Sequence, residues 1–218
     1  MKKIRTIEIK QSIFEENDAA ALRIKEVLKK SGTCMLNIMG SPGCGKTTLI
    51  LALSKLLNTE KILVIEGDVD STVDAEKIIE AGFDSLQINT GGFCHLDANM
   101  IEAAFEKTDI RKYDYIFIEN IGNLICPASY DLGSALNAVL LSVPEGDDKP
   151  LKYPPVFKFA DVVIVSKYDY LEVSDFDFEK FSGHVEFINP KSKIFSVSAK
   201  GGFGLDTLTE YILKNTDA

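Results

Sequence analysis

The chain has 218 residues, of which 45% are hydrophobic and 26% charged, as is usual for a globular protein with a sizeable core. Its net charge of −9 argues against a broad surface for nucleic acid or for an anionic membrane. No apolar stretch approaches the roughly 18–20 residues that span a bilayer, and the residues after Met1 are not those of a secretory signal, so we expect a cytoplasmic protein.

Hydrophobic periodicity predicts helices that alternate with short apolar strands along the chain. A leading amphipathic helix is predicted at Gln11–Lys30, ended by Ser31-Gly32. Strands are predicted at Cys34–Met39, Lys61–Glu66, Ser85–Ile88, Tyr113–Glu119, Asn137–Val143, Asp161–Val165 and Ile194–Val197. Further helices are predicted at Thr47–Leu57, Val73–Ala81, His95–Lys107 and Leu205–Leu213. The segment Pro144–Pro155 holds four of the seven prolines and is predicted to be a mobile loop.

This order of elements indicates an α/β fold of the P-loop NTPase kind, with a mostly parallel sheet and helices on both faces. Strand-like runs continue after the proline-rich segment, so we expect one domain over residues 1–218, with residues 1–32 as a helical segment packed on it. Ligands of such sheets bind beyond the carboxyl ends of the strands. Chemistry is therefore expected in the residues that directly follow each apolar run.

The segment from Gly40 to Thr48 fits the phosphate-binding pattern G-x-x-x-x-G-K-[S/T], in the strand–loop–helix context that this motif requires. Its glycines allow backbone N–H groups to turn toward an anion, and the helix that follows adds the positive end of its dipole. Lys46 is expected to reach the β- and γ-phosphates, and the Thr47 hydroxyl to bind Mg²⁺. The alternative is a glycine turn that only resembles the pattern. The predicted nucleotide-binding residues of this loop are Gly40, Ser41, Pro42, Gly43, Cys44, Gly45, Lys46, Thr47 and Thr48.

Two carboxylates lie at the ends of predicted strands, Asp68 after Glu66-Gly67 and Glu119 before Asn120. Mg²⁺ prefers one or two carboxylates besides phosphate and water, so both are predicted to hold the ion with Thr47 or to orient the attacking water. A glycine at 122 allows the backbone to approach a γ-phosphate and to move when it leaves. The alternative is that both carboxylates cap the segments that follow. The predicted catalytic residues are Lys46, Asp68, Glu119 and Gly122.

Two later strand ends carry Ser166-Lys167-Tyr168-Asp169 and Ser198-Ala199-Lys200. In GTPases a related N/T-K-x-D element reads guanine: its aspartate accepts from N1 and N2, and its lysine stem covers the base, while an S-A-K element contacts O6. Ser166 departs from the usual residue but keeps a hydroxyl, and Tyr168 is bulkier than the usual middle residue. The pattern favours guanine over a coincidental surface pair. The predicted base-binding residues are Lys167, Asp169, Ser198, Ala199 and Lys200.

The four cysteines are too few for a disulfide scaffold at this length. Cys94 and His95 are adjacent after a predicted strand, and Cys126 follows Glu119 by seven residues. Thiolate and imidazole suit Zn²⁺, Ni²⁺ or copper. Three ligands leave a tetrahedral site incomplete, so solvent or a second subunit has to contribute. The spacing alone favours a buried thiol and a capping histidine.

Taken together, these motifs resemble the HypB family, the nickel-incorporation GTPases of hydrogenase maturation in the SIMIBI class of P-loop GTPases. The resemblance covers nearly the whole chain. It includes Asn17–Ser31, Asn37–Leu49, Val64–Asp68, Gln87–Gly91, Cys94–Ala98, Glu119–Ser129 and Glu145–Pro154.

The resemblance implies a metal-responsive GTPase that binds GTP, GDP and Mg²⁺ and couples hydrolysis to nickel insertion into [NiFe]-hydrogenase. It also implies a homodimer that forms with GTP, and partners that are a nickel-delivery protein and the precursor of the hydrogenase large subunit. In that family the Cys-His pair and the later cysteine form a Ni²⁺ or Zn²⁺ site at the dimer interface, so Cys94, His95 and Cys126 inherit this role. Two subunits would supply six ligands.

Loss of the γ-phosphate is then expected to shift Gly122 and, with it, the Cys126 thiolate, so that metal affinity differs between the GTP and GDP states. The few arginines, Arg5, Arg23 and Arg111, supply no obvious catalytic finger, so slow intrinsic turnover is expected.

Departures from the family leave alternatives open. No histidine-rich nickel-storage stretch is present, and no cysteine motif precedes the leading helix. One alternative is a related GTPase for another nickel enzyme, such as urease, although that family places a proline between Cys and His. Another is a P-loop small-molecule kinase, although the chain offers no arginine cluster for a lid. A third is a nucleotide-clamped dimer with a structural metal.

Overall fold

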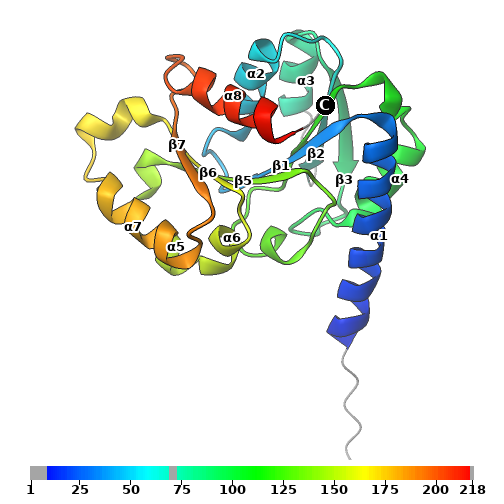
Figure 1. The fold of residues 1–218 in the computed structure, drawn as a ribbon, viewed down its shortest axis with the longest axis horizontal. Helices are drawn as coiled ribbons and strands as arrows, with labels where there is room; N and C mark the ends of the chain where they lie inside the picture. The colour runs from blue at the N-terminus through cyan, green and yellow to red at the C-terminus, as the bar shows by residue number, and fades with distance from the viewer. Residues whose placement is uncertain (1–8, 69–72, 217–218) are drawn as a thin grey trace, which may run out of the picture.

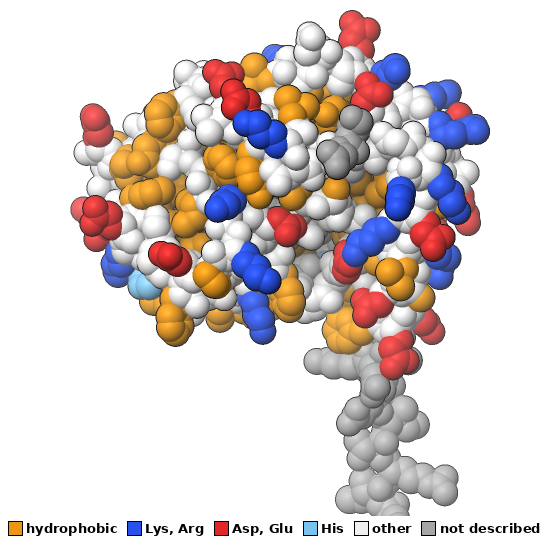
Figure 2. Space-filling model, in the orientation of Figure 1, with side chains coloured by type: hydrophobic (Ala, Val, Ile, Leu, Met, Phe, Trp, Pro, Cys, Tyr) orange, Lys and Arg blue, Asp and Glu red, His pale blue; other side chains and the backbone are white. Residues whose placement is uncertain are grey.

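The protein is described here by a computed structural model that covers residues 9–68 and 73–216 (Figure 1). Residues 1–8 of the predicted domain and of its leading segment lie outside the described residues, as do residues 69–72 and the last two residues. Within the described ranges, none of the helices combines the length and the apolar character needed to cross a bilayer. On the face shown in Figure 2, acidic and basic side chains are interspersed.

Seven parallel strands form one sheet in the order β3-β2-β4-β1-β5-β6-β7. The strands are β1 (Cys34–Gly40), β2 (Ile62–Asp68), β3 (Asp84–Asn89), β4 (Tyr115–Glu119), β5 (Leu136–Ser142), β6 (Val162–Ser166) and β7 (Lys193–Ser196). The predicted α/β class with a parallel sheet is confirmed. The phosphate loop follows β1, the central strand, so the strand ends on either side lie within reach of it.

Helices cover both faces of the sheet (Figure 1). The helices are α1 (Ile9–Ser31), α2 (Lys46–Leu56), α3 (Val73–Glu80), α4 (Ala98–Glu106), α5 (Lys149–Lys152), α6 (Pro154–Lys158), α7 (Phe178–Ile188) and α8 (Leu205–Asn215). Apolar residues of α2, α3 and α8 pack on one face. Those of α1 and α4, and separately those of α6 and α7, pack on the other.

The central strands are buried on both faces, which explains their continuous apolar sequence. In β4, Phe117 belongs to the cluster under α2 and α8, whereas Ile116 and Ile118 belong to the cluster under α1 and α4. Side chains alternate between the two faces with the period of two that a strand imposes. Both faces of β4 are thereby closed to water.

Three segments differ from the sequence-based expectation. Helix α4 begins at Ala98 rather than at His95, because the Asp97 carboxylate caps it by accepting from the Met100 N–H at 2.8 Å. The prediction of a loop at Pro144–Pro155 is wrong: the segment folds into a 3₁₀ turn (Val143–Glu145), α5 and α6, each with a proline in its first turn, where no N–H is needed. Helix α7 was not predicted; Asp177 caps it by accepting from the Lys180 N–H at 3.0 Å.

Candidate nucleotide and metal site

The phosphate loop has the backbone that its glycines predict. Gly43 and Gly45 adopt φ angles of +74° and +99°, which other residues rarely adopt, and α2 starts directly after them. The Lys46 side chain is buried and folds back over the loop, with Nζ 3.3 Å from the Gly40 carbonyl oxygen and 3.2 Å from that of Ser41. A cation and a helix N-terminus therefore meet at the end of β1, which is the arrangement that binds phosphate.

Glu119 lies at the end of β4, beside the phosphate loop. The Thr47 hydroxyl donates to its Oε1 at 2.9 Å, while its Oε2 is buried and has no partner among the described residues. Burial raises the pKa of Glu119 to about 7, against the opposing influences of the Lys46 charge and the Thr47 hydrogen bond. A buried carboxylate oxygen without a partner, next to a threonine hydroxyl, fits the ligand preference of Mg²⁺. Asp68 ends β2 at the same edge of the sheet; its backbone pairs with Asn89, and its side chain lies outside the described part.

The segment after Glu119 lies directly against the phosphate loop. A Cβ atom on Gly122 would lie 2.8 Å from Pro42 Cγ and 3.0 Å from Pro42 N, so only glycine allows this approach. The next residue, Asn123, donates its backbone N–H to the Gly40 carbonyl at 3.1 Å. The predicted switch glycine is thus in contact with the loop that it is expected to sense.

A cavity of about 310 Å³ lies beside the phosphate loop at the ends of β6 and β7. It is lined by Cys44, Gly45, Thr48, Pro144, Ser166, Lys167, Asp169, Tyr170, Ser198, Ala199 and Lys200. The lining includes all five predicted base-binding residues, which come from two separate segments of the chain. Pro144 and Tyr170 were not predicted. Tyr170 follows the motif by one residue, which is the only signal that could have indicated it.

Hydrogen bonds connect the base-side motifs to one another and to the phosphate loop. Ser198 Oγ donates to Asp169 Oδ1 at 2.6 Å, and Ser166 Oγ donates to the Cys44 carbonyl at 2.6 Å. Lys167 adopts φ +52° and extends Nζ to within 2.8 Å of the Gly43 carbonyl oxygen. The Ser166 hydroxyl therefore connects the end of β6 to the phosphate loop.

Tyr168 does not occupy the cavity. Its ring stacks on Phe203, with 5.5 Å between centroids and an interplanar angle of 6°, and it meets the edge of Phe178 on another side. The bulk of this middle residue is accommodated away from the lining. It therefore leaves the cavity open to a base.

The structure brings Cys94, His95 and Cys126 together. Their ligand atoms all lie within 4.8 Å of one another, with the two Sγ atoms 2.7 Å apart and the Cys94 Sγ 3.8 Å from the His95 Nδ1. Among residues 9–68 and 73–216, this is the group of three His, Cys, Asp or Glu side chains that could hold a metal ion. The two cysteines lie in different connections, one between β3 and α4 and the other after β4, so the fold rather than the sequence spacing creates the cluster.

The electrostatics of this cluster suit a soft cation. Burial lowers the pKa of His95, which favours the neutral imidazole that binds metals. The hydrogen bond with Cys126 raises the pKa of the Cys94 thiol, and a bound cation would favour the thiolate instead. The His95 ring stacks on Tyr130 with 3.9 Å between centroids, which fixes its orientation.

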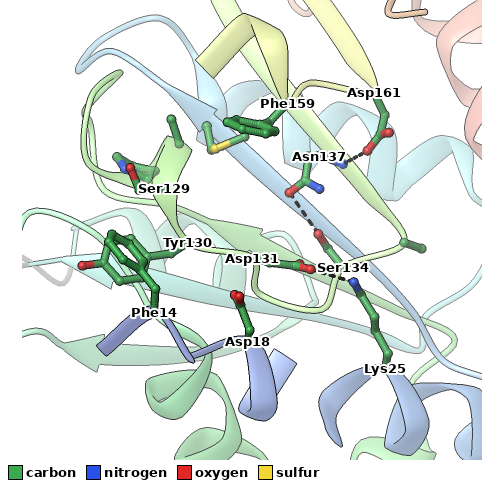
Figure 3. A pocket seen from close by; sticks show the side chains of 14 residues that line it. Phe14, Asp18, Lys25, Ser129, Tyr130, Asp131, Ser134, Asn137, Phe159 and Asp161 are labelled. Carbon is green, nitrogen blue, oxygen red and sulfur yellow. Dashed lines mark hydrogen bonds and ion pairs between the residues drawn. The ribbon is translucent and has the colours of Figure 1, made fainter. Parts of the chain in front are cut away.

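A second cavity of about 790 Å³ adjoins the metal cluster and was not predicted from the sequence (Figure 3). It lies between α1 and the chain that leads from Pro127 into β5. The Asp18 carboxylate points into it from α1, and Lys25 is paired with Asp131 at 2.6 Å. Tyr130 lines this cavity and also stacks on His95, so it connects the cavity to the cluster.

A phosphate loop that opens a helix, a buried carboxylate beside it and a base cavity at the neighbouring strand ends define a P-loop nucleotide-binding protein of the GTPase class. Residues 34–196 match the CobW/HypB/UreG nucleotide-binding domain family. The chain is 42% identical over 214 residues to the hydrogenase/urease maturation factor HypB of Helicobacter pylori strain J99, which covers 96% of this chain and 88% of that protein.

Two further relatives agree. The hydrogenase maturation factor HypB of Escherichia coli K12 is 40% identical over 207 residues, which covers 94% of this chain and 71% of that protein. The crystal structure of HypB from H. pylori in complex with nickel has a TM-score of 0.88 at 43% identity and covers 92% of this chain and 95% of that one. The chain belongs to the HypB family of hydrogenase maturation factors and is a nucleotide-binding GTPase of that family, so the predicted family is confirmed.

Proposed function

We propose that this GTPase hydrolyses GTP with Mg²⁺ and couples hydrolysis to nickel insertion during [NiFe]-hydrogenase maturation. One observation carries the proposal: residues 119–126 run from the carboxylate that bonds Thr47 to a thiol that meets Cys94. A single short segment thus touches both the nucleotide machinery and the metal cluster.

The nucleotide would lie with its phosphates in the loop and its base in the 310 Å³ cavity. Lys46 would leave the Gly40 and Ser41 carbonyl oxygens to reach the β- and γ-phosphates. Thr47, Asp68 and Glu119 would hold Mg²⁺, which neutralises charge on the β/γ-oxygens when bound. Asp169, after giving up its bond from Ser198, would accept from guanine N1 and N2, with the Lys167 stem over the base and residues 198–200 near O6.

Phosphoryl transfer depends mainly on positioning and charge neutralisation, and an arginine finger adds a large factor. Both described arginines are committed elsewhere, Arg23 to Glu102 at 2.6 Å and Arg111 to Asp109 at 2.7 Å. We therefore propose slow turnover by the isolated chain, as in a switch rather than a bulk hydrolase.

Nickel is the cargo that Cys94, His95 and Cys126 would hold, and Zn²⁺ is the competing ion for the same ligands. The nickel-bound crystal structure of the H. pylori relative supports nickel. Cys94 is exposed and the cluster supplies only three ligands, so a second subunit would complete it in a GTP-dependent homodimer. Each protomer would act as one unit over residues 1–218, in the cytoplasm.

The partners would be a nickel-delivery protein and the precursor of the hydrogenase large subunit. A second recipient is worth testing, because the H. pylori relative is a hydrogenase/urease maturation factor. Cys94 and His95 are adjacent, without the proline that the urease-dedicated family places between them.

The nucleotide part of the proposal is tested with Lys46→Ala. We expect GTP hydrolysis to fall by at least about 100-fold, because the buried cation that faces the transferred phosphate is lost. Lys55→Ala, an exposed lysine of the same helix, is the matched control and should hydrolyse GTP as the wild type does. Equal rates for Lys46→Ala and the wild type would contradict the proposed site.

The same assay separates this function from that of a small-molecule kinase. Phosphate release should not depend on added phosphoryl acceptors, and GTP should displace a bound fluorescent GDP far better than ATP does. A rate that rises with a small acceptor molecule would favour the kinase.

A further inference from the structure

Asn123 occupies the point where the two thiol-bearing connections meet. Its side-chain Nδ2 donates to the Cys94 carbonyl at 3.2 Å, and its Oδ1 accepts from the Ile125 N–H at 2.9 Å. Ile125 directly precedes Cys126. One amide group therefore holds the backbone beside both thiols of the metal cluster.

The backbone of the same residue is bonded to the phosphate loop. Its N–H donates to the Gly40 carbonyl at 3.1 Å, in an isolated β-bridge between Asn123 and Gly40. That carbonyl oxygen also lies 3.3 Å from Lys46 Nζ. Asn123 and Lys46 thus share one acceptor. A shift of this oxygen when Lys46 turns to a phosphate would therefore change the backbone hydrogen bond of Asn123.

The amide side chain of Asn123 makes both contacts because it carries a donor and an acceptor. The Cys94 carbonyl needs a donor and the Ile125 N–H needs an acceptor, and an aspartate carboxylate offers only acceptors. The bond to Ile125 alone is an ordinary Asx turn, which asparagine often makes in loops. The bond to Cys94, 29 residues away in the sequence, is not explained by a local turn.

The neighbouring Asn120 fixes the other side of the Cys94–His95 connection. Its Oδ1 accepts from the Leu96 N–H at 3.2 Å, and its Nδ2 donates to Asn37 Oδ1 within β1 at 3.2 Å. Asn120 is buried, so this attachment belongs to the rigid sheet. The connection is therefore anchored to a central strand at Leu96 and to the phosphate loop, through Asn123, at Cys94.

We propose that Asn123 is the positioning residue that transmits the state of the phosphate loop to the metal thiols. The proposal rests on the proposed function, because it presupposes a nucleotide and a metal at the two ends. When the Gly40 carbonyl or the segment that contains Gly122 moves, the Asn123 backbone moves with it. Its side chain then displaces the Cys94 and Ile125 backbones together, which changes the separation of the two sulfurs.

The test compares the Ni²⁺ affinity of the full chain in two nucleotide states, measured by competition with a chromophoric chelator. Each protein is saturated with Mg²⁺ and either GDP or a non-hydrolysable GTP analogue. We expect the two affinities of the wild type to differ by at least about fivefold, the lower end of typical coupling between sites. In Asn123→Ala the ratio should fall to within about twofold of 1.

Two further variants separate the bond to Cys94 from other effects of a substitution. Asn123→Asp still accepts from the Ile125 N–H, so it preserves the turn, but it cannot donate to Cys94; its ratio should also approach 1. Asn215→Ala removes a similar side-chain bond, to the Tyr211 carbonyl at the end of α8, and should keep the wild-type ratio.

A merely structural role would shift the Ni²⁺ affinity equally in both nucleotide states and leave the ratio unchanged. That result, or a wild-type ratio in both Asn123 variants, would overturn the inference while leaving the coupled function intact. A wild-type ratio of 1 would remove the coupled function itself and the inference with it.

Discussion

The candidate nucleotide site (the nucleotide end) and the Cys94–His95–Cys126 cluster (the metal end) are built in different ways. Glu119 and Ser166 are buried residues that end strands β4 and β6, and Lys46 is a buried residue at the start of α2. Cys94 is exposed, and so are Phe93 and Ile125 beside the proposed metal ligands, at 58% and 65%. The nucleotide site is therefore largely formed by the sheet, whereas the Cys94–His95–Cys126 cluster lies beside exposed apolar side chains.

This contrast has a physical origin. Residues at the ends of buried parallel strands are fixed by the ladder on both sides and by packing on both faces. The cysteines lie in connections whose positions depend on a few side-chain hydrogen bonds, chiefly those of Asn120 and Asn123. The proposed coupling would therefore join a site held by the sheet to a site held by a few side-chain hydrogen bonds.

The largest expected effect separates the two ends. Cys126→Ala should weaken Ni²⁺ binding by at least about 100-fold, because it removes one of three ligands, and even the groups that support ligands typically contribute 10- to 100-fold. The GTP affinity of the metal-free protein should change by less than about threefold, since no described contact joins the Cys126 side chain to the nucleotide cavity. Isothermal titration measures both. A comparable loss of GTP affinity would show that the two ends are not built separately.

A pH effect is expected at the nucleotide end of the metal-free, nucleotide-free protein. The folded pKa of Glu119 is raised to about 7 from an ordinary value of 4.5, so between these values the folded state keeps a proton that the unfolded chain has released. The free energy of unfolding should therefore fall as pH rises through this window, by about 2 kcal/mol between pH 5 and 7 at about 1.4 kcal/mol per pKa unit.

The matched variant isolates this contribution. Glu119→Gln does not titrate, so its unfolding free energy, measured by urea denaturation at pH 5 to 8, should lack this part of the slope. Because other groups titrate equally in both proteins, the difference between the two curves reports Glu119. Parallel curves would contradict the burial of an ionisable carboxyl at this position.

The smallest expected effect concerns the bond between the base side and the phosphate loop. Ser166→Ala removes the hydrogen bond to the Cys44 carbonyl, so GTP affinity should fall about fivefold, which corresponds to about 1 kcal/mol for one neutral bond. Ser166→Thr keeps the hydroxyl and should bind more tightly than the alanine variant. Ser182→Ala, which removes a similar bond to the Phe178 carbonyl in α7, is the control and should bind GTP as the wild type does. Equal affinities for alanine and threonine at 166 would show that the bond does not matter.

The two ends also differ in how far the sequence predicts them. The strands, the phosphate loop and the base motifs were predicted because apolar runs and strand-end motifs are local patterns that a parallel sheet brings to one edge. The approach of Cys126 to Cys94 was not predictable from spacing, because the two residues are separated by 32 positions and meet only through the packing of two connections. There the resemblance to a family, rather than any pattern in the residues, indicated the cluster.

The features that the sequence did not predict also depend on contacts between distant segments. The prolines of Pro144–Pro155 predict a loop, yet prolines also suit the first turn of a helix, and only the surrounding packing decides between the two. Asn123 carries no sequence signal of its own, because its role depends on a carbonyl 29 residues away. The 790 Å³ cavity beside Tyr130 likewise arises from α1 packing near β5, which no local pattern encodes.

The most direct test is a crystal structure of the chain with Ni²⁺, Mg²⁺ and a non-hydrolysable GTP analogue. We predict that the sulfurs of Cys94 and Cys126 from the same protomer both bind the nickel ion, while the backbone at Gly122 faces the γ-phosphate. If Gly122 contacted the γ-phosphate but the Cys126 sulfur lay away from the nickel ion, the segment 119–126 would not join the two sites, and coupling through it would be contradicted.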